Sequence, residues 1–359
     1  MSEIRLEGIS KRWGKKVALS SVSLTIPERR FTCLLGPPGA GKTTLLKILA
    51  GLVRPDAGQV FFAGRNVTKE PPRRRNVSII AQDFALYPHM NVYQNIAYPL
   101  RLKRVPKDEI DRRVREVTAF LKIDHLLQRD PTQLSGGEQQ RVAISRGLVK
   151  DADIYLFDEP LTNLDYKIRE DMRAEFRRIQ QETGQTIVYA TSDSIEAISM
   201  SDHVVVLNQG HVVETGNTVE VYQSPAALFT ASFFGYPPMN LFQVKYEQGR
   251  LRHPCFELPL SLDNLVSGRS YSLAVRPEHV GVSDEKPEAD VVFQAQVHLV
   301  DVIGSDAIVY LRMGEFQIKA FVPKTAQLDI GETVWVGLNK VHLFLYDSDS
   351  LHTDLCEVS

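Results

Sequence analysis

The chain lacks the features that would place it in a membrane or in an oxidising compartment. Its 359 residues contain no apolar run of about 18 residues or more, the length that a membrane-spanning helix needs. The first residues are polar and strand-like and do not resemble a secretory signal. Its three cysteines are scattered, without the spacing of a metal site. These absences favour a cytosolic, reduced protein.

An excess of charge of one sign is also absent. The formal net charge is −2, with 24% charged and 43% hydrophobic residues, as in ordinary soluble globular proteins. Such a chain has no overall electrostatic attraction to the phosphates of nucleic acid. The sequence shows no internal repeat and no low-complexity segment. Its length indicates about two domains.

What the chain does contain is a glycine-rich segment, residues 36–44, between an apolar run and a helical pattern. It matches G-x-x-x-x-G-K-[ST], with Lys42 expected to reach the β- and γ-phosphates and Thr43 to ligate Mg²⁺. Glycines let backbone N–H groups curl around phosphate oxygens, and the helix N-terminus adds partial positive charge. A plain Gly–Pro turn is the competing interpretation, and the strand–loop–helix context disfavours it. We predict that a nucleoside triphosphate contacts Gly36, Pro37, Pro38, Gly39, Ala40, Gly41, Lys42, Thr43 and Thr44.

A second chemical signal is the pair of acids Asp158 and Glu159, which ends the apolar run at residues 154–157. Ligands of α/β proteins bind at the carboxyl ends of the strands. Asp158 therefore suits a Mg²⁺ partner acting through water, and Glu159 suits a base that polarises an attacking water. An acidic turn without a chemical role is the alternative, which the nearby phosphate-binding motif makes less attractive.

The pattern of strands and helices changes along the chain. Up to about residue 235, strands alternate with helices, which predicts a mainly parallel α/β sheet with a helical insertion at about 84–150. Residues 71–75 are expected to form a loop. Beyond an expected linker at residues 236–240, the period changes to two, as in a small β domain or barrel. We expect domains at 1–235 and 236–359, with C-terminal strands at 271–275, 291–302, 307–311, 317–322, 334–338 and 341–346.

The segment Leu-Ser-Gly-Gly-Glu-Gln-Gln-Arg at residues 134–141 places Ser135, Gly136 and Gly137 at a helix start. Alone, it could be only a cap and a turn. Placed ahead of Asp158, it closely resembles the signature of ABC transporter ATPases, and the resemblance covers essentially the whole chain. The resemblance implies ATP and Mg²⁺ as cofactors. It also implies a head-to-tail dimer, with ATP between one subunit's phosphate loop and residues 135–137 of the other.

Three further positions match this family one by one. Trp13 matches the aromatic side chain that stacks on adenine, although packing within a hairpin would also account for it. Gln82 matches the Q-loop glutamine that senses Mg²⁺ and the attacking water. Asp165 closes the D-loop at residues 162–165, with Thr where Ser is commoner.

One position departs from the family pattern. The family has a histidine that contacts the γ-phosphate where this chain has Ser192, while Thr191, Asp193 and residues 196–197 keep the pattern. A serine hydroxyl is shorter and cannot carry a positive charge. Three interpretations stay open: slow turnover in a homodimer, one degenerate site in a heterodimer, or a substitution that is tolerated with modest loss. We include Ser192 with Glu159 and Gln82 among the candidate catalytic residues.

Two segments resemble importer ATPases in particular. Residues 84–96 resemble the groove that receives a coupling helix from a membrane subunit. The C-terminal region, with residues 274–279, resembles the OB-like, TOBE-type regulatory domain of sugar-importer ATPases of the maltose-transporter type. An OB-like barrel could also bind oligonucleotides, but residues 241–359 carry 17 Asp and Glu against 10 Lys and Arg, which would repel phosphates.

The resemblance implies an ATPase that energises uptake of a carbohydrate or related small solute. Its expected partners are a second ATPase subunit, two integral membrane permease subunits and a periplasmic or extracellular solute-binding protein, with no nucleic acid. The expected place is the cytoplasmic face of the plasma membrane, held through the permease subunits. The alternatives are import of iron, sulfate, molybdate or polyamines, a soluble ABC ATPase acting on DNA or ribosomes, and a hydrolysis-impaired regulatory clamp suggested by Ser192.

Overall fold

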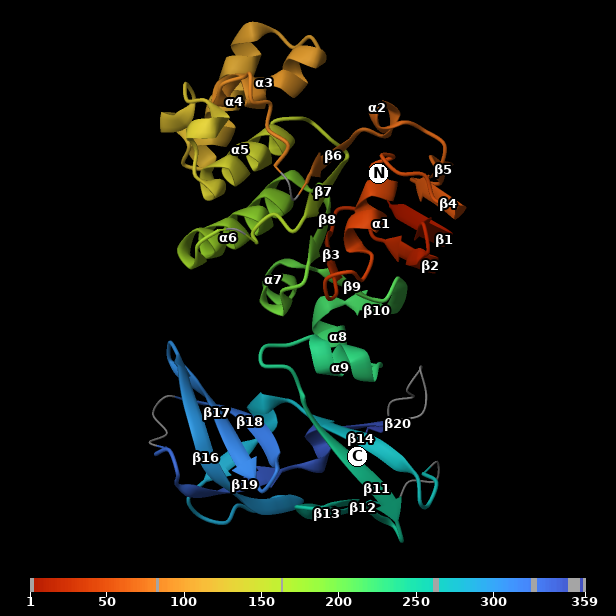
Figure 1. Cartoon of the computed structure of the whole chain (residues 1–359), viewed down its shortest axis with the longest axis vertical. Helices are drawn as coiled ribbons and strands as arrows, with labels where there is room; N and C mark the ends of the chain where they lie inside the picture. Colours follow the sequence, from red (N-terminus) through yellow and green to blue (C-terminus); the bar gives the residue numbers. More distant parts are fainter. Residues whose placement is uncertain are drawn as a thin grey trace. The chain divides into compact units, whose positions relative to one another are not determined.

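The computed structural model describes residues 3–81, 84–162, 164–260, 265–323, 328–347 and 356–357. The chain divides into two compact units, residues 1–221 and 222–359 (Figure 1). The domain boundary that the sequence suggested after residue 235 stays a prediction. Within the described residues, no helix combines the length and the apolar character needed to cross a membrane.

The first unit is built on two sheets. Their strands are β1 Ile4–Trp13, β2 Lys16–Ile26, β3 Phe31–Leu35, β4 Ala57–Phe62, β5 Arg65–Asn66, β6 Val77–Ile80, β7 Ile154–Asp158, β8 Thr186–Thr191, β9 His203–Asn208 and β10 His211–Asn217. The smaller sheet has the antiparallel order β2-β1-β4-β5. The larger has the order β10-β9-β3-β8-β7-β6, with parallel pairs except for β10 on β9. Every residue of β3, β7 and β8 is buried, as expected for parallel strands covered on both faces.

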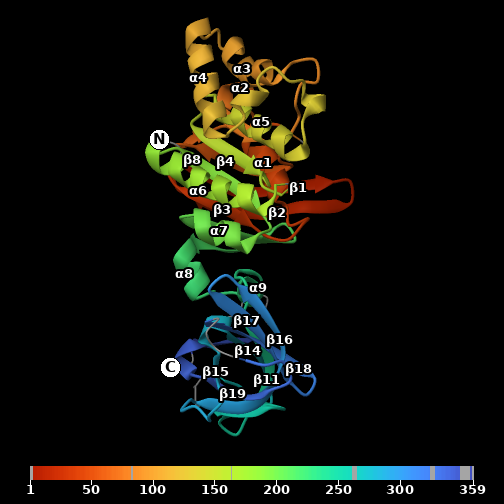
Figure 2. The same cartoon turned by 90° about the vertical axis from the view of Figure 1, so that its left-hand side faces the viewer.

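The remaining elements of this part of the chain are helices. They are α1 Lys42–Leu49, α2 Pro72–Arg75, α3 Val92–Leu102, α4 Lys107–Phe120, α5 Gly136–Leu148, α6 Tyr166–Thr183, α7 Ser194–Met200 and α8 Thr218–Gln223, with single 3₁₀ turns at Asp124–Leu126 and Pro131–Gln133. Helix α1 lies between the two sheets, because Leu45 and Leu49 share one core with Leu6 and Leu156. Figure 2 shows α6 and α7 across the face of the larger sheet. There the Phe176 ring of α6 lies 4.9 Å from the Phe157 ring of β7.

The helical insertion expected from the sequence contains α3, α4 and α5, which lie together in Figure 1. The loop expected at residues 71–75 is wrong in part, because Pro72–Arg75 forms the short helix α2. Proline suits the first helical turn, where its missing N–H has no partner to lose. Arg75 then donates to the carbonyls of Ile48 and Leu49, which end α1. The buried arginine thus joins the two helices.

The second unit consists almost entirely of antiparallel strands. They are β11 Asn240–Glu247, β12 Arg250–His253, β13 Phe256–Pro259, β14 Ser270–Val275, β15 Gly281–Ser283, β16 Val291–Ile303, β17 Asp306–Met313, β18 Phe316–Pro323, β19 Thr333–Leu338, β20 Leu343–Asp347 and β21 Cys356–Glu357, beside helix α9 Leu228–Phe233 and 3₁₀ turns at Pro277–His279 and Lys340–His342. The two sheets have the orders β13-β12-β11-β14-β20-β21 and β15-β19-β16-β17-β18. Apolar residues of both sheets form one core, including Leu273, Val297, Ile318 and Leu345.

The sequence prediction for this unit misses the strands β11 to β13, β15 and β21 and misplaces the start of β20. Strand β11 begins at Asn240, inside the segment expected to be a linker. The last expected strand began at residue 341, but residues 341 and 342 belong to a 3₁₀ turn and the strand starts at Leu343. The backbone N–H of Lys340 donates to Asp290 (2.8 Å), which fixes that turn.

Candidate nucleotide site

The phosphate-binding motif joins β3 to α1, as its sequence context predicted. The Lys42 side chain is 5% exposed, and its ammonium donates to the carbonyl oxygens of Gly36 (2.7 Å) and Pro37 (3.2 Å). The loop therefore folds around its own lysine. The backbone N–H of Gly36 donates to the carbonyl of Thr191 at the end of β8 (3.3 Å), which ties the loop to the neighbouring parallel strand.

Two glycines of this loop are required by close backbone contacts. A Cβ at position 36 would lie 2.2 Å from the carbonyl oxygen of Leu207, which is closer than any side chain allows. Gly41 has a φ of +106°, and a Cβ there would lie 2.5 Å from the carbonyl oxygen of Ala18. Both contacts are with backbone, which cannot move aside as a flexible side chain could. The tight path of the loop therefore depends on these two residues.

The structure brings Thr43 and Asp158 together, as expected for a shared metal ion. The Thr43 hydroxyl donates to Asp158 Oδ1 at 2.9 Å. Asp158 ends the buried strand β7, and burial raises the pKa of its carboxyl, opposed by the Thr43 hydrogen bond. A buried carboxylate without a cation in direct contact is costly. A divalent cation is the group that would best stabilise it, and hydroxyl and carboxylate oxygens suit Mg²⁺.

Glu159 lies beside the phosphate-binding lysine. Its Oε1 is 3.3 Å from Lys42 Nζ, and its backbone N–H donates to the carbonyl of Ala190 at 3.0 Å. The residue adopts a φ of +47°, a left-handed conformation that non-glycine residues rarely adopt. Such conformations persist where the surrounding structure holds them, often at functional sites. The turn after β7 therefore presents the carboxylate at the same strand edge as Asp158.

Ser192 follows the end of β8 directly and is exposed. The residues around it form a hydrogen-bonded network. The hydroxyls of Tyr189 (2.9 Å) and Thr191 (2.7 Å) both donate to Glu196 Oε2, and the backbone N–H of Asp193 donates to the Thr191 hydroxyl (3.0 Å). Burial raises the pKa of the Glu196 carboxyl, which is 4% exposed. The backbone on both sides of Ser192 is thereby held.

Sequence reasoning missed the role of Glu196, although it noted that residues 196–197 keep the family pattern. Asp193 caps α7, since its Oδ1 accepts from the backbone N–H of Ile195 (2.8 Å). A capping residue followed three positions later by an acid was the available signal. The acid does not complete a capping box, however. It turns inward to the hydroxyls of β8, a contact that spacing along one helix does not reveal.

Trp13 ends β1, and its side chain is 52% exposed. Its backbone pairs with that of Lys16 across the hairpin. The Lys11 ammonium lies 5.2 Å from the centre of the Trp13 ring. A large, half-exposed ring held at a hairpin end suits stacking on a base better than it suits a core position.

The signature segment and the D-loop lie at the starts of α5 and α6. Ser135 caps α5, with its side chain and that of Glu138 forming a reciprocal capping box, while Gly136 and Gly137 form the first turn. Asp165 caps α6, with Oδ1 accepting from the backbone N–H of Ile168 (3.0 Å). Helix α5 belongs to the helical insertion, whereas α1 lies between the two sheets. The phosphate-binding loop before α1 and residues 135–137 at the start of α5 therefore lie apart within one chain (Figure 1). Gln82 lies outside the described residues.

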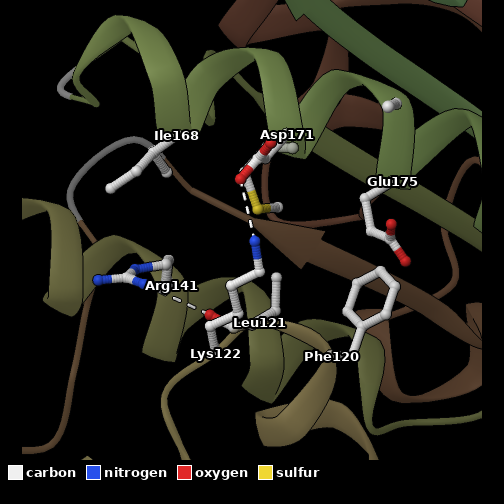
Figure 3. Close-up of a pocket in the computed structure, with 9 residues that line it drawn as sticks. Phe120, Leu121, Lys122, Arg141, Ile168, Asp171 and Glu175 are labelled. Atoms are coloured by element: carbon white, nitrogen blue, oxygen red, sulfur yellow. Dashed lines mark hydrogen bonds and ion pairs between the residues drawn. The ribbon is translucent and has the colours of Figure 1, made fainter.

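A pocket of about 230 Å³ lies elsewhere in the first unit, between the end of α4, α5 and α6 (Figure 3). Across it, Lys122 Nζ is 3.0 Å from Asp171 Oδ2, and Arg141 donates to the carbonyl of Leu121 (3.4 Å). None of the candidate site residues lines this pocket. It is a gap between packed helices that an ion pair crosses, and it is separate from the phosphate-binding loop.

The fold and the grouped side chains define a nucleotide-binding P-loop protein. A glycine loop, a lysine, a hydroxyl and two carboxylates meet at the carboxyl edge of a parallel sheet. That edge is where α/β proteins bind ligands. Within the described part of the chain, no three His, Cys, Asp or Glu side chains gather as a metal site.

Comparisons with known proteins extend this assignment. The family described as ABC transporter matches residues 19–162, and the TOBE domain family matches residues 273–345. The trehalose/maltose import ATP-binding protein MalK of Thermococcus litoralis is 38% identical, over 96% of this chain and 98% of that protein. The sn-glycerol-3-phosphate import ATP-binding protein UgpC of Chromohalobacter salexigens is 41% identical over 314 residues, 87% of this chain and 85% of that protein.

A solved structure gives the same result for the first unit. It is a dimer of the ATP-binding cassette MJ0796 in a post-hydrolysis state, bound to ADP and Pi, with a TM-score of 0.56 and 30% identity over 60% of this chain and 98% of that one. This chain belongs to the ABC transporter family of ATP-binding proteins, of the type with a TOBE domain. The predicted fold class, an α/β ABC-type domain followed by a β-rich TOBE-type domain, is confirmed.

Proposed function

We propose that this chain hydrolyses ATP and thereby powers import of a carbohydrate or of sn-glycerol-3-phosphate through separate membrane subunits. The observation that carries the ATPase part is the cluster of Lys42, Thr43, Asp158 and Glu159 at one strand edge. The solute class rests on relatives named for trehalose/maltose and sn-glycerol-3-phosphate import, which align over most of the chain. Iron, sulfate or polyamine import is the alternative within the same fold.

Each side chain of the cluster has a role in this proposal. Lys42 and the backbone N–H groups of residues 36–44 bind the phosphates, while Trp13 stacks on the adenine. Thr43 and Asp158 hold Mg²⁺, with Gln82 as a further ligand. When bound, Mg²⁺ neutralises charge that develops on the phosphate oxygens. Glu159 orients and polarises the attacking water.

The complete site needs a second subunit in this proposal. Residues 135–137 of one subunit face the nucleotide held by the phosphate loop of the other, and Asp165 contributes at the same junction. The dimeric state of the related cassette MJ0796 supports this arrangement. Two membrane permease subunits and a periplasmic or extracellular solute-binding protein complete the importer. The permease subunits hold the chain at the cytoplasmic face of the plasma membrane in this proposal.

Purification of the chain in complex from its native membrane tests the import function. We expect membrane permease subunits to co-purify, and we expect ATP-driven uptake when the complex and its binding protein are reconstituted in vesicles. A panel of a disaccharide, sn-glycerol-3-phosphate, sulfate and a polyamine distinguishes the solute classes. Recovery of the chain without any integral membrane subunit would contradict the import function.

Ser192 favours a second candidate function, a hydrolysis-impaired regulatory clamp paired with an intact ATPase chain. The intact Lys42, Asp158 and Glu159 favour hydrolysis instead. The subunit composition of the purified complex separates the two. One kind of ATPase chain with ATP turnover supports the first function, and two kinds with activity lost only on mutation of the partner support the second.

A further inference from the structure

Asp56 holds the end of β1 from a distant part of the sequence. Its backbone N–H donates to the carbonyl of Ser10 (2.8 Å). Its Oδ1 accepts from the Lys11 ammonium (2.7 Å), and its Oδ2 accepts from the backbone N–H of Arg12 (2.7 Å). One aspartate therefore contacts each of the three residues that precede Trp13.

Lys11 extends this hold to the Trp13 ring. The Lys11 side chain is only 14% exposed, and its ammonium is paired with Asp56. Its ammonium lies 5.2 Å from the centre of the ring, where a cation is attracted to the aromatic face. The hydrogen bond from Lys11 keeps the pKa of the Asp56 carboxyl below its usual value.

The contacts of Asp56 and Lys11 come in addition to the backbone pairing that already forms the β1–β2 hairpin. The strands β1 and β2 already pair through their backbones up to Trp13 and Lys16. Half of the Trp13 side chain stays exposed, so the ion pair does not serve to bury the ring in a core. The ion pair instead places a cation beside an exposed aromatic ring. A ring fixed before binding loses less conformational freedom when a ligand stacks on it.

We propose that Asp56 and Lys11 are positioning residues that hold Trp13 ready for the base of the nucleotide. This inference rests on the adenine contact of Trp13 in the proposed function. Neither residue touches the nucleotide in this proposal, so both act through Trp13. Loss of Asp56 frees the Lys11 ammonium and the backbone of Arg12, and the ring then samples more positions.

Binding of two ligands to the full-length chain tests this inference. Mg-ATP and Mg-tripolyphosphate share phosphates but only ATP has a base, so the ratio of their dissociation constants isolates the contribution of the base. We expect Asp56→Ala to weaken ATP binding about two- to tenfold, the range for one additional side chain to immobilise. Tripolyphosphate binding should stay unchanged. Asp56→Asn, which retains an acceptor for Arg12, and Lys11→Met should each show a smaller loss of the same kind.

Trp13→Ala separates this inference from its premise. We expect it to remove the preference for ATP over tripolyphosphate, and we expect Asp56→Ala to add nothing in that background. An equal loss of ATP affinity in both backgrounds would overturn the positioning role. So would an unchanged ratio in Asp56→Ala while Trp13→Ala lowers it. If Trp13→Ala itself leaves the ratio unchanged, the adenine contact fails, and the positioning role fails with it.

The matched control is Glu7→Gln on the same strand. Glu7 pairs with Arg5 at the surface, away from Trp13. This variant therefore loses an ion pair of β1 without changing the contacts of Asp56 and Lys11. We expect it to bind both ligands as the wild type does. Thermal unfolding of each variant establishes that the chain is folded. A variant with lower stability still answers the question, because a general loss of structure weakens both ligands and leaves the ratio unchanged.

Discussion

The two units of this protein use buried polar groups differently. In the first unit, Lys42 at the start of α1, Asp158 at the end of β7 and Glu196 on α7 are buried and meet other polar side chains or loop carbonyls. The buried Arg75 of the same unit donates to backbone carbonyls. In the second unit, Arg276 is the one buried Asp, Glu, Lys or Arg among the described residues, and its guanidinium donates to the backbone carbonyls of Phe234 and Tyr222.

The difference follows from what each unit does with its polar groups. A buried carboxylate raises the free energy of the fold, and the first unit accepts this cost at Asp158 and Glu196. The second unit places its buried guanidinium on the backbone carbonyl oxygens of Phe234 and Tyr222. Changes in the first unit should therefore alter chemistry more than stability, and changes at Arg276 should alter stability more than chemistry.

Glu159→Gln should have the largest effect. Because Gln cannot accept a proton from the attacking water, we expect ATP turnover to fall about 10²- to 10⁴-fold with ATP still bound. Steady-state phosphate release by the assembled complex and a nucleotide-binding titration measure the two quantities. The melting temperature should change little. Wild-type turnover in this variant would remove Glu159 from the catalytic role.

Arg276→Met should be the most destabilising change in the second unit. Two backbone carbonyls lose their donor, at about 1–3 kcal/mol for each unsatisfied group. The guanidinium also lies 3.6 Å from the centre of the Tyr222 ring, and that contact is lost. Urea unfolding followed by Trp335 fluorescence in a Trp13→Phe background reports on this unit. Stability within about 0.5 kcal/mol of wild type would contradict the role of Arg276.

Arg250→Met is the matched control for that measurement. Arg250 lies on β12 of the same unit and pairs with Glu257 at the surface (3.1 Å). Exposed pairs contribute about 0–1 kcal/mol, so the unfolding midpoint should barely move. The difference in stability between the two variants therefore reports the effect of losing a buried arginine, because both variants lose one positive charge.

Ser192→His should raise ATP turnover if the serine limits hydrolysis. An imidazole is longer than a hydroxymethyl group and can donate to the γ-phosphate as a cation, and we expect a gain of up to about tenfold. Ser192→Ala should leave turnover near the wild-type value. The idea fails if Ser192→His changes nothing while wild-type turnover already lies in the range of about 1–100 s⁻¹.

Glu196→Gln should have the smallest effect of these substitutions, a change in melting temperature that depends on pH. Burial raises the pKa of Glu196 in the folded chain, so its contribution to stability is present at low pH and is lost as pH rises through that pKa. The melting temperature of wild type minus that of Glu196→Gln should therefore fall as pH rises from the ordinary titration range of glutamate through the raised pKa of Glu196. A change of about 2–4 °C corresponds to roughly 1 kcal/mol in a unit of this size.

The groups around position 196 are the same in the wild type and in the Glu196→Gln variant. Asp193, Arg169 and Cys33 titrate or carry charge near it, and Tyr189 donates to it. Their effects cancel in the difference between the two melting curves to the extent that Gln leaves them unchanged. A difference that rises with pH would mean that ionised Glu196 stabilises the fold.

The sequence was informative where chemistry and local geometry coincide. The apolar run of β7 followed by two acids predicted buried carboxylates at a strand end, and the structure has Asp158 there beside Thr43. Helix α6 ends at Gly184, whose left-handed conformation is a common way for a helix to stop and is readable from the glycine in the sequence. The strands β11 to β13 escaped prediction, because short strands between turns carry too little periodic signal.

By itself, the sequence determined the phosphate-binding loop, its two acids and the serine at position 192, because these depend on residue types at fixed spacings. Only the tertiary structure decided which distant residues hold that site in place. Asp56 meets Lys11 and Glu196 meets Tyr189 through contacts between different elements. Such contacts form when packed elements bring side chains together, and a local pattern of residues does not encode them.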